Sequence, residues 1–293
     1  MSVNEKRLNI TEFDFDDVKD NLKVFLKNQT EFKDYDFEGS GMNIMLDILA
    51  YNTHYLGFNA NMLANEMFLD SASLRSSVVS HAKTLGYEVQ SARSPIATVN
   101  VALATTSSSK TMPAGTAFST TVDEVSYQFV TIADATATGA GGVVTFNNVG
   151  IYEGTYIITK YLTDTSDIEQ RFILPDSRAD TSTLTVKVQN SASDTTSTTY
   201  TKATDISQLS STSSVYYLQE VEGGKHEVYF GDGNISKSLS DGNIVILQYV
   251  VTNKTAANGA SSFTAPSSID GVSDIIVTTV SNAGGGAEPE SID

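Results

Sequence analysis

The segment MNIMLDILAYNTHYLGFNANMLANEMF, residues 42–68, decides how the N-terminal part of this chain folds. It follows a turn-like EGSG stretch at residues 38–41, and its apolar residues recur every three or four positions. This spacing predicts a helix that, at 1.5 Å per residue, is roughly 40 Å long.

The predicted helix carries two apolar faces instead of one. The first face consists of Met42, Met45, Leu49, Leu56, Leu63 and Met67, and the second of Ile44, Ile48, Tyr51, Tyr55, Phe58 and Met62. Leaving a whole face in water would forfeit on the order of 10 kcal/mol, because burial of each large apolar side chain contributes about 1.5–3 kcal/mol. Either the neighbouring helices cover these faces within the chain, or they pack in a bundle with another molecule.

Two shorter helices flank the long one. Asp14 can cap a helix that runs to about Lys27, with an apolar stripe made of Val18, Leu22, Phe25 and Leu26. A third helix is bracketed by the capping candidates Asp70, Ser71 and Ser73 and by Gly86, and it carries Leu74, Val78, Val79, Ala82 and Leu85. Residues 1–92 are therefore expected to form a helical, partner-bundling region.

After Pro95 the sequence changes to short runs of Val, Ile, Thr, Tyr and Phe separated by turn residues, which is typical of strands. The expected strands are residues 96–104, 127–132, 143–149, 156–162, 184–188, 215–220, 227–230, 244–251 and 275–280. IVILQYVV, residues 244–251, is almost continuously apolar, so we expect it inside a sheet with both faces covered.

These patterns predict an α+β chain, with the helical region followed by β-rich domains at residues 93–205 and 206–293. Two segments look like surface connections, residues 191–205 and the Gly-rich linker NAGGGAEPESID at 282–293. No closing element follows that linker, which suggests a part of a longer protein, although a flexible tail would look the same.

Composition narrows the classes of partner. The 35 acidic and 18 basic side chains give a formal charge of -17, which repels nucleic acid and anionic lipid. There is no cysteine, so disulfides and thiolate metal sites are excluded. The N-terminus lacks the apolar core of a secretory signal, and no apolar run is long enough for a membrane span.

No catalytic, cofactor or metal site is expected, and the chain is predicted not to be an enzyme. The only histidines, His54, His81 and His226, stand in no recognisable nucleophile motif. Asp232, Asn234 and Asp241 could suggest a calcium loop, but their spacing misses the EF-hand pattern and turn chemistry explains the Asp-Gly pairs better. The GGGAEPE stretch lacks the Lys-Ser/Thr of a phosphate-binding loop.

Four stretches, taken together and in order, resemble a known family. They are residues 21–95, RFILPDSRADTSTLTVKVQNS at 171–191, HEVYFGDGNISKSLSDGNIVILQYVVTN at 226–253 and SNAGGGAEPESID at 281–293. They are similar to the N-terminal part of the ring-forming baseplate wedge proteins of T-even-like contractile-tailed phages, within the broader baseplate J-like group.

The resemblance implies a structural protein of the virion, located in the tail baseplate and assembled in the host cytoplasm. It implies partners among the other wedge proteins and a dimer within each wedge, held by an N-terminal helical bundle. The bundle role would fall on residues 42–68, with both apolar faces as candidate interface. Members of the family continue beyond the segment that matches residues 281–293, and their ring-closing region lies there, so ring formation by residues 1–293 alone is in doubt.

Two other classes compete with this interpretation. A secreted or surface adhesin that binds carbohydrate would suit the Thr- and Ser-rich β part, but there is no signal peptide, and no Trp to stack on a sugar. A metal-dependent hydrolase would need a cluster of ligands that three scattered histidines do not supply.

Overall fold

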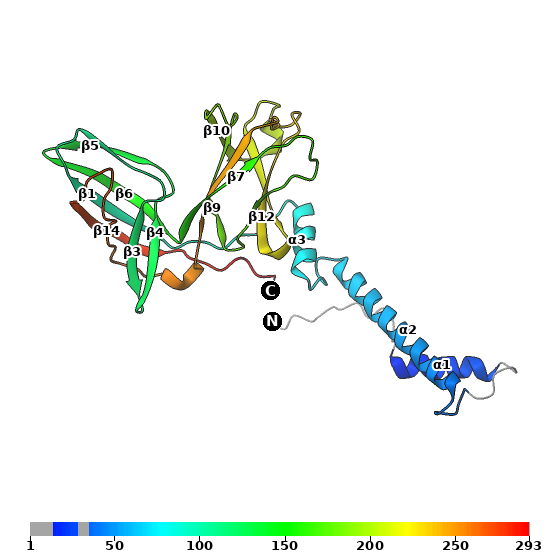
Figure 1. Cartoon of the computed structure of the whole chain (residues 1–293). Helices are drawn as coiled ribbons and strands as arrows, with labels where there is room; N and C mark the ends of the chain where they lie inside the picture. The colour runs from blue at the N-terminus through cyan, green and yellow to red at the C-terminus, as the bar shows by residue number, and fades with distance from the viewer. Residues whose placement is uncertain (1–13, 29–34, 293) are drawn as a thin grey trace. The chain divides into compact units, whose positions relative to one another are not determined.

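The computed structural model describes residues 14–28 and 35–292, so most of the N-terminal stretch used above to exclude a secretion signal lies outside it. The chain divides into a helical unit that ends at Tyr87 and a β-rich unit from Glu88 to Ser291. The expected α+β class, with helices first and strands after, is confirmed (Figure 1). Of the helices in the described ranges, none has the length and apolar character needed to cross a membrane.

The helical unit contains α1 (Phe15–Lys27), α2 (Gly41–Glu66) and α3 (Arg75–Thr84). The Asp14 carboxylate caps α1 by accepting a hydrogen bond from the Phe15 backbone N–H, and Ser40 caps α2 by accepting one from the Asn43 N–H at 3.1 Å. Both helices therefore begin within a residue or two of the positions that the sequence predicts.

Helix α3 is anchored differently from the expectation. Its N-cap residue, Leu74, has no side-chain cap, and Asp70, Ser71 and Ser73 do not take that role. Instead the carboxylate of Glu66, the last residue of α2, accepts hydrogen bonds from the backbone N–H groups of Ser73 and Leu74 and from the Ser73 hydroxyl, at 2.8–3.2 Å. The preceding helix thus supplies the cap for the next one.

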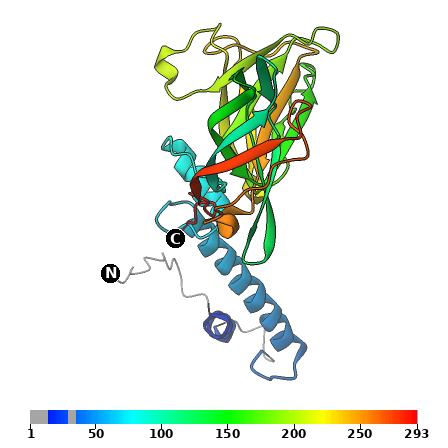
Figure 2. The same ribbon diagram turned by 90° about the vertical axis from the view of Figure 1, so that its left-hand side faces the viewer.

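The β-rich unit is built from two sheets of seven strands each. The first sheet runs in the order β14-β1-β6-β4-β3, with β2 and β5 attached beside β6. Its strands are β1 (Ile96–Ala104), β2 (Ser109–Met112), β3 (Ala117–Val122), β4 (Val125–Val130), β5 (Ala135–Ala140), β6 (Val143–Glu153) and β14 (Ile275–Gly284). The turn of the chain that brings β14 back beside β1 is visible in two views (Figure 1, Figure 2).

The second sheet has the order β7-β13-β9-β10-β11-β12-β8. Its strands are β7 (Thr155–Leu162), β8 (Phe172–Leu174), β9 (Ala179–Gln189), β10 (Ser197–Lys202), β11 (Val215–Val221), β12 (Lys225–Phe230) and β13 (Ile244–Val251). β13 lies between β7 and β9, as its apolar run predicts. Only one of its faces is fully buried, however, because Ile244, Ile246 and Gln248 on the other face are half-buried.

This topology differs from the expected division of the β part at residue 205. β10 and β11, on either side of that point, are hydrogen-bonded in parallel within one sheet. The first sheet takes its strands from residues 96–153 and again from 275–284, so residues 155–251 form a second sheet inserted into the first. Each sheet buries its own apolar cluster, around Leu103 and Phe129 in the first and around Leu247 and Tyr249 in the second.

Two segments expected to be surface connections take part in this structure. Residues 197–202 form β10, and Tyr200 is buried in the core of the second sheet. Residues 282–290 run beside residues 90–95. Arg93 and Ala287 exchange two backbone hydrogen bonds. The Gln90 N–H donates to the Glu290 carboxylate, and the Glu290 N–H donates to the Gln90 carbonyl. The Gly-rich segment is therefore fastened to the β-rich unit and not free.

Buried acidic groups lie where the two sheets join. Glu153, at the end of β6, is fully buried, and its carboxylate accepts hydrogen bonds of 2.7–2.9 Å from the Thr252 hydroxyl and from the backbone and side-chain amides of Asn253. Asp180 in β9 is likewise buried and accepts hydrogen bonds from Ser94 and Ser182. Three or more donors on each carboxylate compensate its lost hydration.

Candidate partner interface

Helix α2 packs within its unit through a third face, distinct from the two apolar faces. Its buried residues are Asn43, Leu46, Ala50 and Gly57. Helix α1 packs along this helix, and an ion pair of 2.5 Å between the Lys19 ammonium and the Asp47 carboxylate joins the two. Hydrogen bonding to Asp47 raises the pKa of Lys19, so this contact holds the charged form of the lysine.

Both apolar faces of α2 are left open by this packing. The exposed members are Met45, Leu49, Leu56, Leu63 and Met67 on the first face and Ile44, Ile48, Tyr51, Tyr55, Phe58 and Met62 on the second, with exposed fractions from 42% at Met62 to 68% at Leu63. Met42 is half-buried. The sequence left open whether the neighbouring helices cover these two faces. Within the helical unit, α1 and α3 do not cover them.

A shallow groove links the two faces near the middle of the helix. Ile48, Leu49, Tyr51, Asn52 and Tyr55 line it. The Tyr51 and Tyr55 rings lie 5.7 Å apart with their planes inclined by 40°. Tyrosines of this kind offer a large apolar area together with a polar tip, a combination that is enriched at protein interfaces.

Sequence periodicity missed part of this exposed surface. Phe25, a member of the apolar stripe expected on α1, is 62% exposed, and its neighbour Val24 is exposed to a similar extent. α1 has no fully buried residue, so its side chains reach α2 only partly. A helical period shows that residues share a face, but it does not show which of several faces the rest of the chain will cover.

The features that could suggest chemistry have structural explanations. His54, His81 and His226 lie on three different elements, α2, α3 and β12. The Asp232 carboxylate accepts hydrogen bonds from the backbone and side chain of Asn234, which closes a turn and lowers the pKa of Asp232. Within the described ranges, no three His, Asp or Glu side chains gather in a way that could hold a metal ion.

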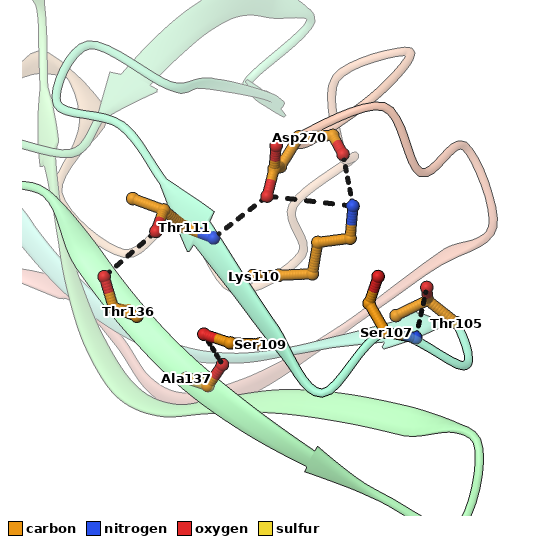
Figure 3. A network of polar contacts seen from close by, with 8 residues as sticks. All are labelled: Thr105, Ser107, Ser109, Lys110, Thr111, Thr136, Ala137 and Asp270. Atoms are coloured by element: carbon orange, nitrogen blue, oxygen red, sulfur yellow. Dashed lines mark hydrogen bonds and ion pairs between the residues drawn. The ribbon is translucent and has the colours of Figure 1, made fainter.

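A second polar network fastens the turn before β14. The Lys110 ammonium donates to the Asp270 carbonyl at 2.8 Å, and the Thr111 N–H donates to the Asp270 carboxylate at 3.2 Å (Figure 3). Thr111 and Thr136 join β2 to β5 through their hydroxyls. These groups bind one another, and the network therefore stabilises the loop instead of presenting a site.

In comparison with known proteins, both units match domain models from one kind of protein. The family model described as baseplate wedge protein gp6-like, helical domain, matches residues 14–87, which contain all three helices. The model described as bacteriophage baseplate wedge protein gp6, third domain, matches residues 157–260, which contain most of the second sheet. Both models describe domains of bacteriophage baseplate wedge proteins, and this is the class of protein that the two matches indicate.

A curated relative agrees with both models. The baseplate wedge protein gp6 of Enterobacteria phage T4 is 30% identical to the chain over 307 aligned residues, which cover 95% of the chain and 45% of that relative. The chain thus resembles gp6-like baseplate wedge proteins in both of its units, and the resemblance seen in its sequence is confirmed. It spans less than half the length of this relative.

The anchoring of α3 by Glu66 leads to a first prediction. Hydrogen bonds from Ser77 and Ser73 lower the pKa of Glu66 from 4.5 to about 2. Its contribution to stability is therefore fully present above pH 4.5 and is lost as the pH falls toward 2. We expect the Ser73 and Leu74 amide resonances to titrate with a midpoint near 2 and Glu66→Gln to remove this titration, at a cost of about 1 kcal/mol or less because solvent screens this partly exposed group.

The matched control is Asp70→Asn, which changes the acid that the sequence favoured as a cap. This variant should leave the titration of both amides in place, because no cap hydrogen bond to α3 comes from Asp70. A midpoint near the ordinary glutamate value, or a titration lost in Asp70→Asn, would contradict the Glu66 cap.

Proposed function

We propose that this chain is a structural component of a contractile-tail baseplate wedge, where it assembles with other wedge subunits around the tail hub. The observation that supports this most directly is the pair of open apolar faces on α2, within a region that matches the helical domain of gp6-like wedge proteins. A helix that is apolar nearly all round is stable in water only when other elements cover it. Residues 1–92 would act as the bundling region, and the β-rich part would carry further contacts.

The partners proposed for α2 are a second copy of the chain, as a dimer within a wedge, and helices of another wedge protein. The interface would include Met42, Met45, Leu49, Leu56, Leu63 and Met67 on one face and Ile44, Ile48, Tyr51, Tyr55 and Phe58 on the other. Two faces allow one helix to take part in a bundle of three or more helices, because each face can meet a different neighbour.

The proposed role is non-enzymatic and belongs in the virion, with assembly in the host cytoplasm. The formal charge of -17 opposes binding to nucleic acid or to an anionic membrane. Both matching family models and the curated relative describe baseplate wedge proteins, and nothing in them favours the carbohydrate-binding adhesin considered as the alternative.

Sedimentation of the purified chain, alone and with a helical wedge protein from the same phage, tests the proposal. We expect self-association that rises with protein concentration, or a stable complex with the wedge protein, because burial of the α2 faces is worth on the order of 10 kcal/mol. A second run in high salt serves as control, since an apolar seam persists where a purely ionic contact weakens. A chain that stays monomeric and also ignores the wedge protein would contradict the bundle.

A further inference from the structure

Strand β14 forms an open edge of the first sheet. It is paired with β1 alone (Figure 1, Figure 2). Among the described residues, the backbone from 275 to 282 forms no ladder with any strand except β1. Hydrogen bonds to Gly259 and Ala260 begin at Ala283. Alternate residues of this stretch therefore present their N–H and C=O groups to the outer side of the sheet.

The other sheet edges are protected in ways that β14 is not. At the opposite edge of the first sheet, β2 is only four residues long, and Ser119 of β3 exchanges two backbone hydrogen bonds with Thr264, at 2.8 and 3.0 Å. In the second sheet, the edge strand β7 carries an exposed Lys160, and the edge strand β8 is only three residues long. Covering segments, lysines and short length are the usual means by which proteins prevent pairing at an edge.

β14 is ten residues long, IIVTTVSNAG, and has neither a charged residue nor a proline. On its outward face Ile276 is 64% exposed and Val280 is 52% exposed. The strands of the whole first sheet carry two charged residues, Lys110, which is bound to Asp270 (Figure 3), and Glu153, which is buried. Although the chain has a formal charge of -17, two copies that approach each other at β14 bring no charged side chains of the strand together.

We propose that β14 pairs with β14 of a second copy, antiparallel and centred on Thr278, so that two first sheets become one continuous sheet. In this register Thr278 faces itself, Ile276 faces Val280, and Asp274 faces Asn282, so apolar residues meet apolar residues and no two acids are opposed. The strand is self-complementary about Thr278, which favours a second copy over an unrelated strand. This two-fold contact occupies the β14 edge of each copy. No β14 edge is left for a third copy, so the assembly closes as a dimer.

This contact is separate from α2 and does not depend on the bundle proposed above. It would give two copies within a baseplate a second point of attachment, in the β-rich unit. Two independent attachments on one chain make an assembly more stable than either contact would alone.

Single cysteines test the register, because the natural chain contains none. In the full chain, Thr278→Cys should cross-link to itself in high yield with a short bis-maleimide, since directly opposed Cβ atoms lie about 5 Å apart. Ile276→Cys alone should not, because two copies of that position would lie ~13 Å apart along the strands. A mixture of Ile276→Cys and Val280→Cys chains should cross-link again.

Charge variants test the same contact without a cross-linking reagent. Thr278→Lys and Thr278→Glu should each weaken the β14 contact about tenfold or more, because like charges then face each other, and an equal mixture of the two should restore it. Cross-linking at Thr278→Cys should also persist when Leu49 and Leu56 of α2 are changed to aspartate. The proposal is overturned if Thr278→Cys fails to cross-link, if Ile276→Cys alone cross-links equally well, or if the α2 changes abolish the cross-link.

Discussion

Changing both Leu49 and Leu56 to aspartate is expected to abolish association through α2 while both units stay folded. The two leucines lie seven residues apart on the first apolar face and are 49% and 60% exposed in the single chain. Because they contribute little to the packing of the helical unit, their loss should not unfold it. In a bundle, however, each aspartate would be buried without a partner, and we expect association to weaken at least a hundredfold, about 3 kcal/mol.

Sedimentation and thermal melts of the wild type and the variant, with and without a helical wedge protein, measure both effects. The matched control is Leu162→Asp with Ile168→Asp, which makes a similar chemical change at two of the most exposed apolar side chains outside residues 1–92, 63% and 96% exposed. This control should associate like the wild type. A monomeric wild type whose melting temperature falls in the Leu49/Leu56 variant would show that the face is covered within the chain and would refute the bundle.

The helices were the part of the fold that could be predicted most closely. α1 and α2 begin and end within two residues of the expected positions, because caps and apolar spacing are local features of the sequence. The cap of α3 could not be predicted. It comes from Glu66, which lies in the preceding helix, and the local candidates Asp70, Ser71 and Ser73 gave no indication of a cap supplied from there.

For the β part, strands could be predicted but their sheets could not. All nine expected strands overlap observed ones, since buried strands carry dense Val, Ile and Tyr. β2, β3, β5, β8 and β10 were missed because they are short or rich in Ser, Thr and Ala. The insertion of the second sheet into the first depends on β14 pairing with β1, across more than 170 residues, and no local pattern records such a pairing.

The candidate interface could be predicted as a set of residues but not as a surface. Periodicity placed the two apolar faces of α2 correctly on the helix. It could not show that packing within the unit would use a third face, with Leu46 and Ala50 buried. That result depends on where α1 lies, and the position of α1 follows from contacts such as Lys19 with Asp47.

The junction between the two sheets depends on one glycine. Gly154 follows the buried Glu153 and precedes β7, and its φ is 127°, a region that side-chain-bearing residues rarely adopt. A Cβ atom there would lie 2.2 Å from the Val251 carbonyl oxygen and 2.7 Å from a methyl group of Val250. Because the carbonyl belongs to the backbone of β13, which is paired with β7 and β9 in the second sheet, it cannot move aside without disturbing the strand pairing.

Gly154→Ala is therefore expected to destabilise the β-rich unit by about 3 kcal/mol or more, which for a unit of this size corresponds to a melting temperature lower by roughly 6–12 °C. The control Gly142→Ala separates collision from backbone strain, because Gly142 also has a positive φ, 83°, but a Cβ there would meet no atom within 4 Å. That variant should cost only about 1–2 kcal/mol. Thermal melts and urea titrations of the full chain measure both. Equal losses in the two variants would mean that strain alone matters and that the junction can relax around the added methyl group.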